Sequence, residues 1–332
     1  MPLLSALSSL RSTLCPLPSP LYPWPSTLSP VRVRREAIRF GMLVYLNGQY
    51  VPVDEATISA LDRGFIFGDG IYEVWRVVRG QLFEPARHQA RLERGLSELR
   101  IARPADGTFE RITAIAERLL KENALTDGDA TLYVEITRGT APRTHFFPPG
   151  DTTPTLLVMA NAFTPSDARF TGTRVITQPD VRWLRCDLKT VQLLPNVLAR
   201  QAATEAGASE AIFVRDGTIT EGTHTTVFAV IDGVLRTHPA SHLVLPGVTR
   251  DIVLELAPDA GVRVREVAIG VEELSRATEL FLTGTTTDVT PVVSVDGRPI
   301  GEGSPGAIAR ALLERLLERM GLRAAAFATS SD

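Results

Sequence analysis

Short runs of alternating apolar and polar residues fill much of the first half of this chain. Tyr45–Val51 predicts a β-hairpin, because Asn47-Gly48 suits the positive φ angles of a tight two-residue turn. Helical spacing of apolar residues follows at residues 86–101 and 109–123. Further strands are predicted at residues 71–78, 81–83, 132–138 and 154–160.

The second half also mixes strands and helices. Its strands are separated by Asp-Gly turns at residues 216–217, 232–233 and 296–297. Helical patterns occur near residues 195–207, 248–257 and 305–320. Because strands and helices do not alternate regularly, the pattern argues against a Rossmann or TIM-barrel architecture. The sequence therefore predicts an α+β fold without internal repeats.

Residues 1–41 differ in composition from the rest and are predicted to be a disordered or non-native extension. They are rich in Pro, Ser, Leu and Arg, and Glu36 is their only acidic residue. An organelle transit peptide is one interpretation, although the prolines would interrupt the amphipathic helix that such a leader needs. The other interpretation is a misassigned start, with Met42 as the true first residue. The segment 161–168 is the predicted linker between two domains.

Length and composition limit the classes of function. A chain of 332 residues favours two domains. The formal net charge of −3 gives no basic footprint for nucleic acid, and no apolar run approaches the roughly 20 residues needed to cross a bilayer. With Cys15 and Cys186 as the only cysteines, a disulfide framework is not expected, and a reducing, cytoplasmic location is favoured.

Lysine is scarce in this chain. Of 35 basic residues, only Lys121 and Lys189 are lysines, and the rest are arginines. A lysine retained in such a chain suggests chemistry that a guanidinium cannot perform, such as nucleophilic attack by a primary amine. Lys121 lies at the end of a polar helix, whereas Lys189 has apolar neighbours that could desolvate it.

Two segments suit a phosphate group. Leu245-Pro-Gly-Val-Thr-Arg-Asp leads directly into a helical pattern, so the free amides of Val248 and Thr249 form an anion site. Simple capping by Thr249 is the alternative. The hydroxyl-rich segment around Gly284 could also bind phosphate, or could be an ordinary turn.

Other polar residues become informative in combination. Glu221 follows a short strand and could pair with a cationic ring nitrogen, and the glycines before Tyr72 could direct its phenol into a cleft. Arg143 and His145 could both donate to a carboxylate, although a solvated loop is equally compatible. A metal site at His238 and His242 is not expected, because Pro239 separates them and no carboxylate completes the set. A desolvated lysine, two phosphate sites, an acid and carboxylate donors together suggest pyridoxal 5'-phosphate.

Five motifs make the sequence resemble the fold-type IV aminotransferases, and within them the D-amino-acid aminotransferases, from about Met42 to about Leu317. They occur in the family's order: Asp62–Glu73, Arg182–Lys189, Thr220–Gly222, Leu245–Asp251 and Thr283–Pro291. The resemblance implies a homodimer whose active site is completed by a loop of the partner subunit. It also implies a small N-terminal α/β sandwich domain at residues 42–160, a larger C-terminal pseudo-barrel domain at 169–325 that binds the cofactor, and a disordered tail at 326–332.

The resemblance also implies roles for individual residues. Lys189 would form the aldimine with pyridoxal 5'-phosphate and transfer the substrate proton, and Glu221 would keep the pyridine nitrogen protonated. Leu245 would lie against the ring. The phosphate ligands would be Arg91, Val248, Thr249 and Thr285.

Substrate choice depends on the segment from Arg138 to Phe147. Arg143 and His145, together with Tyr72, match the residues with which D-amino-acid aminotransferases bind the substrate α-carboxylate. The expected reaction converts D-alanine and 2-oxoglutarate to pyruvate and D-glutamate by a ping-pong mechanism. Two departures from the family pattern affect this expectation. In the hydroxyl-rich segment after Glu221, His224 is bulky and Thr226 stands where an amide is usual, and Gly284 replaces a frequent serine.

Three alternatives remain at this stage. The first is a branched-chain L-amino-acid aminotransferase or a broad-range transaminase of the same fold. The second is a non-catalytic protein that only carries the vitamin, and the third is a metal-dependent hydrolase using His238 and His242.

Overall fold

The computed structural model describes residues 41–322 of the chain. Except for Gly41, the predicted extension at residues 1–41 lies outside this range, as does the predicted tail at 326–332. Within residues 41–322, no helix combines the length and the apolar character that crossing a membrane would need.

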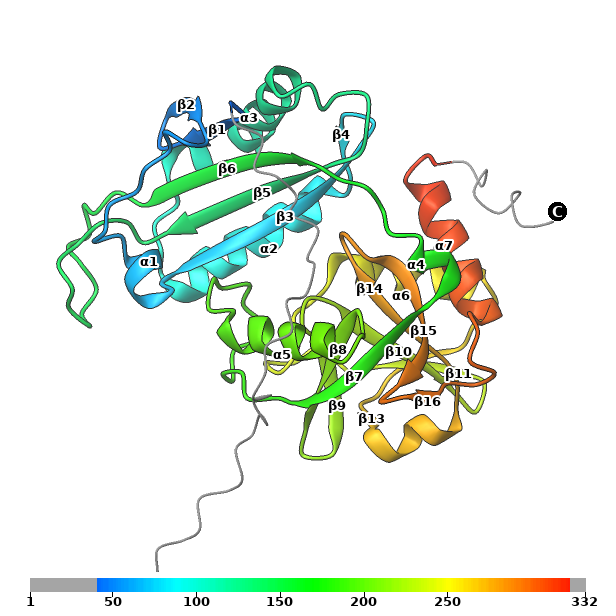
Figure 1. Cartoon of the computed structure of the whole chain (residues 1–332). Coiled ribbons are helices and arrows are strands. Elements are labelled where there is room, and N and C mark those ends of the chain that lie inside the picture. Colours follow the sequence, from blue (N-terminus) through cyan, green and yellow to red (C-terminus); the bar gives the residue numbers. More distant parts are fainter. Residues whose placement is uncertain (1–40, 323–332) are drawn as a thin grey trace, which may run out of the picture. The chain divides into compact units, whose positions relative to one another are not determined.

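The first half of the chain forms a six-stranded sheet in which every pair is antiparallel. The strand order is β2-β1-β6-β5-β3-β4 (Figure 1). The strands are β1 (Leu43–Leu46), β2 (Gln49–Pro52), β3 (Gly70–Val78), β4 (Gln81–Leu82), β5 (Ala130–Thr137) and β6 (Thr155–Ala162). Helices in this half are α1 (Arg63–Phe67), α2 (Pro85–Leu99) and α3 (Phe109–Glu122), with a 3-10 turn at Ala105–Gly107.

Two amphipathic helices cover this sheet. Helix α2 begins with Pro85, whose missing amide hydrogen costs nothing at a helix start. In α3, the Thr108 side chain accepts from the Arg111 amide and so caps the helix. Apolar residues of both helices share one core with the sheet, including Leu92, Leu119 and Trp75. The first sheet is therefore a framework with a hydrophobic core of its own.

The second half forms a ten-stranded mixed sheet. Its main order is β12-β11-β10-β14-β15-β7-β8-β9-β13, and β16 pairs with β15. The strands are β7 (Thr173–Pro179), β8 (Glu210–Arg215), β9 (Thr218–Gly222), β10 (Thr226–Ile231), β11 (Val234–Thr237), β12 (Val264–Glu266), β13 (Ile269–Gly270), β14 (Ala277–Gly284), β15 (Asp288–Val295) and β16 (Arg298–Pro299). Its helices are α4 (Ala168–Thr171), α5 (Leu194–Glu205), α6 (Val248–Asp259), α7 (Ala307–Arg319) and a 3-10 helix at Val271–Arg276.

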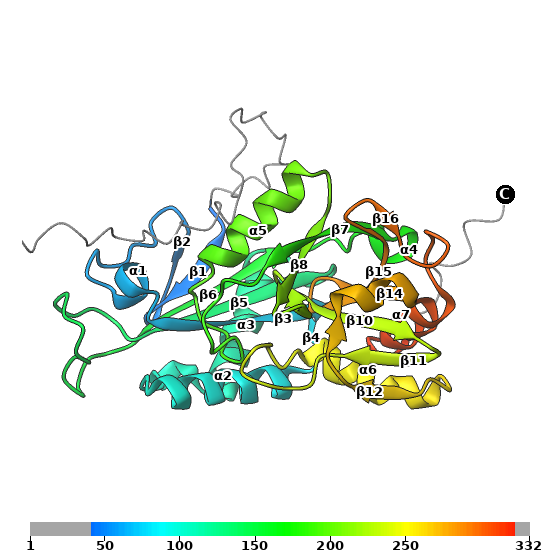
Figure 2. The ribbon, with the colours of Figure 1, turned by 90° about the horizontal axis from the view of Figure 1, so that it is seen from below.

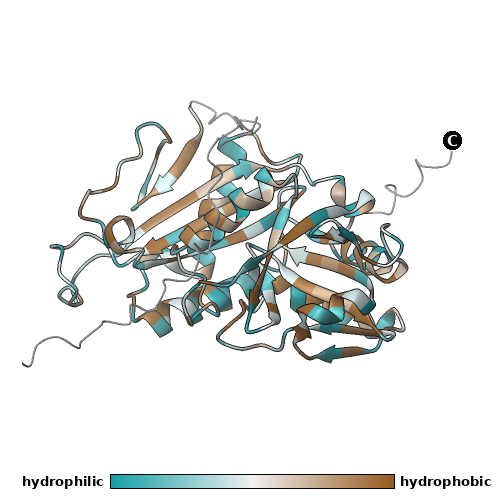
Figure 3. Ribbon diagram, turned by 60° about the horizontal axis from the view of Figure 1, so that its bottom comes forward, coloured by the Kyte–Doolittle hydropathy of each residue, from teal (hydrophilic) through white to brown (hydrophobic). Residues whose placement is uncertain are grey.

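Helices cover the second sheet on opposite sides, α5 on one and α6 on the other (Figure 2). Helices α6 and α7 share a core with β10, β14 and β15, in which Phe228 and Phe281 stack with ring centroids 5.1 Å apart. Hydrophobic colour follows the strands of both sheets, whereas hydrophilic colour is concentrated in turns and helices (Figure 3). The α+β fold and the curled, barrel-like second sheet agree with the prediction.

Most predicted elements are confirmed, with ends that differ from the prediction by up to about two residues. Asn47 and Gly48 have φ values of 47° and 93°, as the hairpin requires. The predicted linker began at residue 161, but β6 continues through Ala162 because Asn161 and Ala162 pair with β5. The loop before α4 thus begins only at residue 163. The two sheets lie on either side of it, and the division into two domains stays a prediction.

Candidate active site

The segment that carries Lys189 runs along β3. The Tyr72 amide donates to the Lys189 carbonyl at 2.9 Å, and the Val191 amide donates to the Gly70 carbonyl at 3.2 Å. These bonds fix the lysine backbone and place its Nζ 4.3 Å from the centroid of the Tyr72 ring. Tyr72 in turn stacks on Tyr133, with centroids 5.6 Å apart. The most distinctive amine of the chain is therefore held over an aromatic ring.

Glu221, at the end of β9, is the buried acid of the same pocket. One carboxylate oxygen accepts from Arg182 Nη1, and the other accepts from the Leu245 amide at 3.0 Å. Burial raises the pKa of Glu221 above its usual value, although the Arg182 guanidinium opposes this effect. A cation bound beside Glu221 would favour its charged form.

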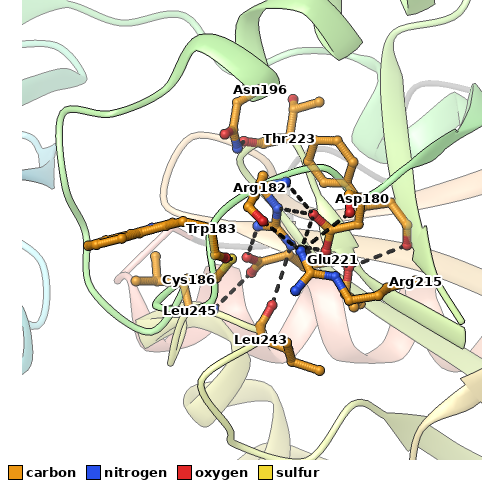
Figure 4. Close-up of polar contacts among 12 residues, drawn as sticks. Asp180, Arg182, Trp183, Cys186, Asn196, Arg215, Glu221, Thr223, Leu243 and Leu245 are labelled. Atoms are coloured by element: carbon orange, nitrogen blue, oxygen red, sulfur yellow. Dashed lines mark hydrogen bonds and ion pairs between the residues drawn. The ribbon is translucent and has the colours of Figure 1, made fainter. Parts of the chain in front are cut away.

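Arg182 lies between two carboxylates, as Figure 4 shows. Besides Glu221 it binds Asp180, with Nε 2.9 Å from Oδ1 and Nη2 2.8 Å from Oδ2. Arg215 Nη2 lies 3.0 Å from Oδ1 of Asp180. Burial disfavours the charged form of Asp180, but Arg182 outweighs this and lowers the pKa of the carboxyl. The carboxylates of Glu221 and Asp180 and the guanidinium groups of Arg182 and Arg215 thus alternate in one ion-pair network.

Two of the predicted phosphate ligands, Val248 and Thr249, are the first residues of α6. Gly247 occupies the N-cap position and has no side chain that could accept from the first helical amides, those of Val248 and Thr249. On the neighbouring β14, the Thr283 hydroxyl is buried and has no partner within residues 41–322. Free amides and an unpaired hydroxyl at a positive helix end suit a phosphate dianion.

Arg91, on α2, is oriented toward this helix start. Its Nη1 donates to the Pro246 carbonyl at 2.7 Å, while its Nε and Nη2 bind both oxygens of Glu73. Burial disfavours the charged Glu73 carboxylate, but Arg91 and His88 together outweigh burial and lower the pKa of Glu73 to about 2. Glu73 is therefore a permanent counter-charge that fixes the guanidinium.

One pocket contains Tyr72, Lys189, Glu221 and Leu245. Arg91, Val248, Thr249 and Thr285 are not among its lining residues; they lie beyond Leu245 and Pro246 or on the turn after Thr283. The amine, the ring acid and the phosphate donors fit the aldehyde, nitrogen and phosphate of pyridoxal 5'-phosphate. The lining is completed by Arg182, Trp183, Cys186, Leu188, Thr190, Gln192, Leu193, Asn196 and the segment Gly222–Thr225.

Arg143 and His145 do not line this pocket. They are exposed on the loop after β5, where the Arg143 guanidinium lies 5.4 Å and the His145 ring 5.8 Å from the centroid of Phe67. His145 lines a neighbouring hollow that shares Trp183, Thr190 and Gln192 with the lysine pocket. Within one chain, the two predicted carboxylate donors are thus adjacent to the pocket and outside it.

The remaining predicted residues have ordinary surroundings. Cys186 is buried, and burial raises the pKa of its thiol to about 11. His238 Nδ1 lies 2.8 Å from the Pro239 carbonyl oxygen. Among the described residues there is no group of three His, Cys, Asp or Glu side chains arranged to hold a metal ion.

Sequence reasoning missed the residues that support the predicted ones. Asp180, Arg182 and Arg215 form the ion-pair network next to Glu221. Glu73 forms an ion pair with Arg91. Glu210 accepts hydrogen bonds from the pocket segment Thr223–Thr225. Asp180 and Arg182 could have been noticed as an acid and a base two residues apart before the lysine. No local sequence pattern distinguishes Glu73 or Glu210 from other acidic residues.

Comparison with known proteins gives consistent matches. The family model described as amino-transferase class IV matches residues 70–295. D-alanine aminotransferase of Staphylococcus haemolyticus is 38% identical over 272 residues, covering 82% of this chain and 95% of that protein. The Bacillus licheniformis D-alanine aminotransferase is 40% identical over 271 residues, covering 81% and 94%. Among solved structures, the T.th. branched-chain amino acid aminotransferase with pyridoxamine 5'-phosphate has a TM-score of 0.77 at 29% identity, covering 87% of this chain and 97% of that one.

Proposed function

Because this chain belongs to the class IV aminotransferase family, we propose that it transfers the amino group of D-alanine to 2-oxoglutarate, using pyridoxal 5'-phosphate bound at Lys189. The products would be pyruvate and D-glutamate. The observation that carries the proposal is the shared pocket of Lys189, Glu221 and Tyr72.

Each pocket residue has a defined task in this proposal. When bound, the cofactor supplies an aldehyde and a pyridine ring that accepts electrons. Lys189 Nζ would hold the cofactor by its aldehyde and would take up the proton that leaves the substrate Cα. Glu221 would favour the protonated ring nitrogen by ion pairing, and Arg182 together with the Leu245 amide fixes the Glu221 carboxylate for this role.

The phosphate would be bound from two directions. The amides of Val248 and Thr249 approach it along the axis of α6, and Thr285 contributes from the turn after β14. Arg91 adds a guanidinium whose position is set by Glu73. Leu245 would pack against the ring and exclude water from one of its faces.

We infer that a second copy of the chain completes the substrate site. Arg143 and His145 are exposed, and large apolar side chains of the same loop and of the lysine side of the pocket are exposed with them. These include Phe146 (81%), Leu194 (68%) and Leu184 (61%). Such apolar exposure is typical of a surface that another subunit covers. In a homodimer, Arg143 and His145 of one chain would bind the α-carboxylate in the partner's pocket, opposite Tyr72. A cytoplasmic location stays a prediction from the low cysteine content.

A paired stereochemical assay tests this function. Purified holoprotein is given D-alanine or L-leucine, each with 2-oxoglutarate, and formation of the two oxo acids is followed separately. The proposal predicts turnover with D-alanine and at most a trace with L-leucine.

The alternative is a branched-chain L-amino-acid aminotransferase, because solved structures of that type share the fold. Preference for L-leucine would establish this alternative and leave the roles of Lys189 and Glu221 unchanged. The greater identity to D-alanine aminotransferases favours the D-amino-acid reaction.

A further inference from the structure

His224 is a pocket residue with an unusual support. It lies in the segment between β9 and β10 and lines the same pocket as Lys189. Its Nδ1 is 2.9 Å from Glu210 Oε2, while the His224 side chain keeps 46% of its surface exposed. Within residues 41–322 the second ring nitrogen, Nε2, makes no hydrogen bond, so it can donate to a ligand.

Glu210 is buried next to the segment Thr223–Thr225. Its side chain is only 2% exposed, and it accepts from the hydroxyls of Thr223 at 2.5 Å and Thr225 at 3.2 Å. Arg200 Nη1 lies 3.6 Å from its Oε1. Burial alone would favour the neutral acid, but His224 and the Thr223 hydroxyl lower the pKa of Glu210 to about 2. Glu210 is therefore a fixed negative charge that orients the His224 ring through Nδ1.

The other cations that line the pocket are already engaged. Arg182 binds Asp180 and Glu221, and Lys189 is the reacting amine of the proposed function. Two amide side chains of the lining are engaged as well: Asn196 Nδ2 donates to the Thr223 carbonyl at 2.7 Å, and Gln192 Nε2 to the Gly68 carbonyl at 3.5 Å. Among the side chains lining this pocket that can carry a positive charge, His224 is thus the one left to donate to a ligand.

The proposed reaction needs such a donor in one of its two halves. D-Alanine and pyruvate carry one carboxylate, whereas 2-oxoglutarate and D-glutamate carry a second at the end of the side chain. A donor that meets only the second carboxylate makes a charge-assisted hydrogen bond with the dicarboxylates alone and raises the affinity for them.

We propose that His224, held by Glu210, binds the side-chain carboxylate of dicarboxylic substrates and so makes this pocket selective for 2-oxoglutarate over simple 2-oxo acids. The inference rests on the proposed function and assigns a task to a residue that departs from the family pattern. His224 acts as a specificity residue, and Glu210 acts as its positioning residue.

The test compares the holoenzyme with the variants His224→Ser, His224→Gln and Glu210→Gln, using His242→Ser as a control. His242 is an exposed histidine that does not line the pocket. For each protein, kcat/KM is measured with 2-oxoglutarate and with pyruvate as amino acceptor. Binding of glutarate and of butyrate is measured by calorimetry, which does not depend on turnover.

Loss of one charge-assisted hydrogen bond corresponds to about a tenfold loss of affinity or more. His224→Ser is therefore expected to lower the ratio of 2-oxoglutarate to pyruvate kcat/KM by about tenfold or more, mainly through KM. Glutarate binding should weaken in parallel, with butyrate binding much less affected. His224→Gln, which keeps an amide donor, should be intermediate, and Glu210→Gln should change the ratio in the same direction.

The inference is overturned if His224→Ser keeps the wild-type ratio and the wild-type glutarate affinity, as His242→Ser should. That result would leave D-alanine turnover, and hence the proposed function, unaffected. If the wild-type enzyme instead prefers L-leucine, the proposed function fails, and the comparison of glutarate with butyrate still decides the role of His224.

Discussion

Replacing Asp180 by Asn tests the charge network behind Glu221. The Asp180 side chain is fully buried and accepts from Arg182, Arg215 and the Thr220 hydroxyl. Asparagine has nearly the same volume but no charge, and its NH2 group would face a guanidinium that also donates. The variant therefore changes the electrostatics without opening a cavity.

The expected magnitude follows from counting charges. Arg182 and Arg215 are balanced by Asp180 and Glu221 in the native cluster, and their side chains are 6%, 14%, 0% and 8% exposed, respectively. The Asp180→Asn variant would leave one uncompensated positive charge. Removing one partner of a buried ion pair costs about 3–5 kcal/mol of unfolding free energy. The matched control is Glu122→Gln in the exposed pair with Arg118, for which we expect a much smaller loss because water screens both charges.

Urea unfolding of the apoproteins, followed by circular dichroism, measures both losses at neutral pH. Because the folded pKa of Asp180 is lowered, its stabilisation is present above the ordinary value of 3.8 and is lost as the pH falls through the folded pKa. The difference between wild type and Asp180→Asn should shrink accordingly in acid. Equal losses for Asp180→Asn and Glu122→Gln would refute the reasoning.

Three further predictions concern other parts of the site. Because burial raises the folded pKa of Glu221, stability of the apoprotein should fall as the pH rises through that pKa. Glu221→Gln should remove this decline in the urea midpoints, and a pH profile that this variant leaves unchanged would contradict the assignment. Arg143→Ala should raise KM for D-alanine about tenfold or more while cofactor affinity, measured by fluorescence titration, stays the same; parallel losses would count against a carboxylate role. Gly139 has φ 89°, and a Cβ there would lie 2.0 Å from the Thr153 carbonyl oxygen. Gly139→Ala should therefore lower the melting temperature clearly, whereas Gly128→Ala should not, because the space around Gly128 is open.

The sequence predicted much of the fold because the deciding signals are local. Asn-Gly and Asp-Gly pairs fixed four turns, whose first residues all have positive φ in the structure. Pro246-Gly247 marked the start of α6 within one residue. The end of β6 was missed, since the pairing of Asn161 and Ala162 depends on β5 and not on their own polarity.

Composition alone, without the family resemblance, singles out a candidate site residue only where that residue is unusual in itself. Lys189 was conspicuous because lysine is scarce. Arg182 was not, because arginine is abundant and its partner Glu221 is 39 positions away. Glu210 was invisible for the same reason: only the fold brings it beneath Thr223, His224 and Thr225. The placement of Arg143 outside its own chain's pocket likewise depends on the path of a loop.

The central claim concerns the ε-amino group of Lys189, and chemical trapping tests it most directly. Holoprotein is reduced with borohydride, digested and sequenced by mass spectrometry, and the mass of the phosphopyridoxyl group is located. We predict the label on the peptide that contains Lys189, with the peptide that contains Lys121 unmodified. A label on Lys121, or none on Lys189 in protein that had been yellow before reduction, would contradict the account.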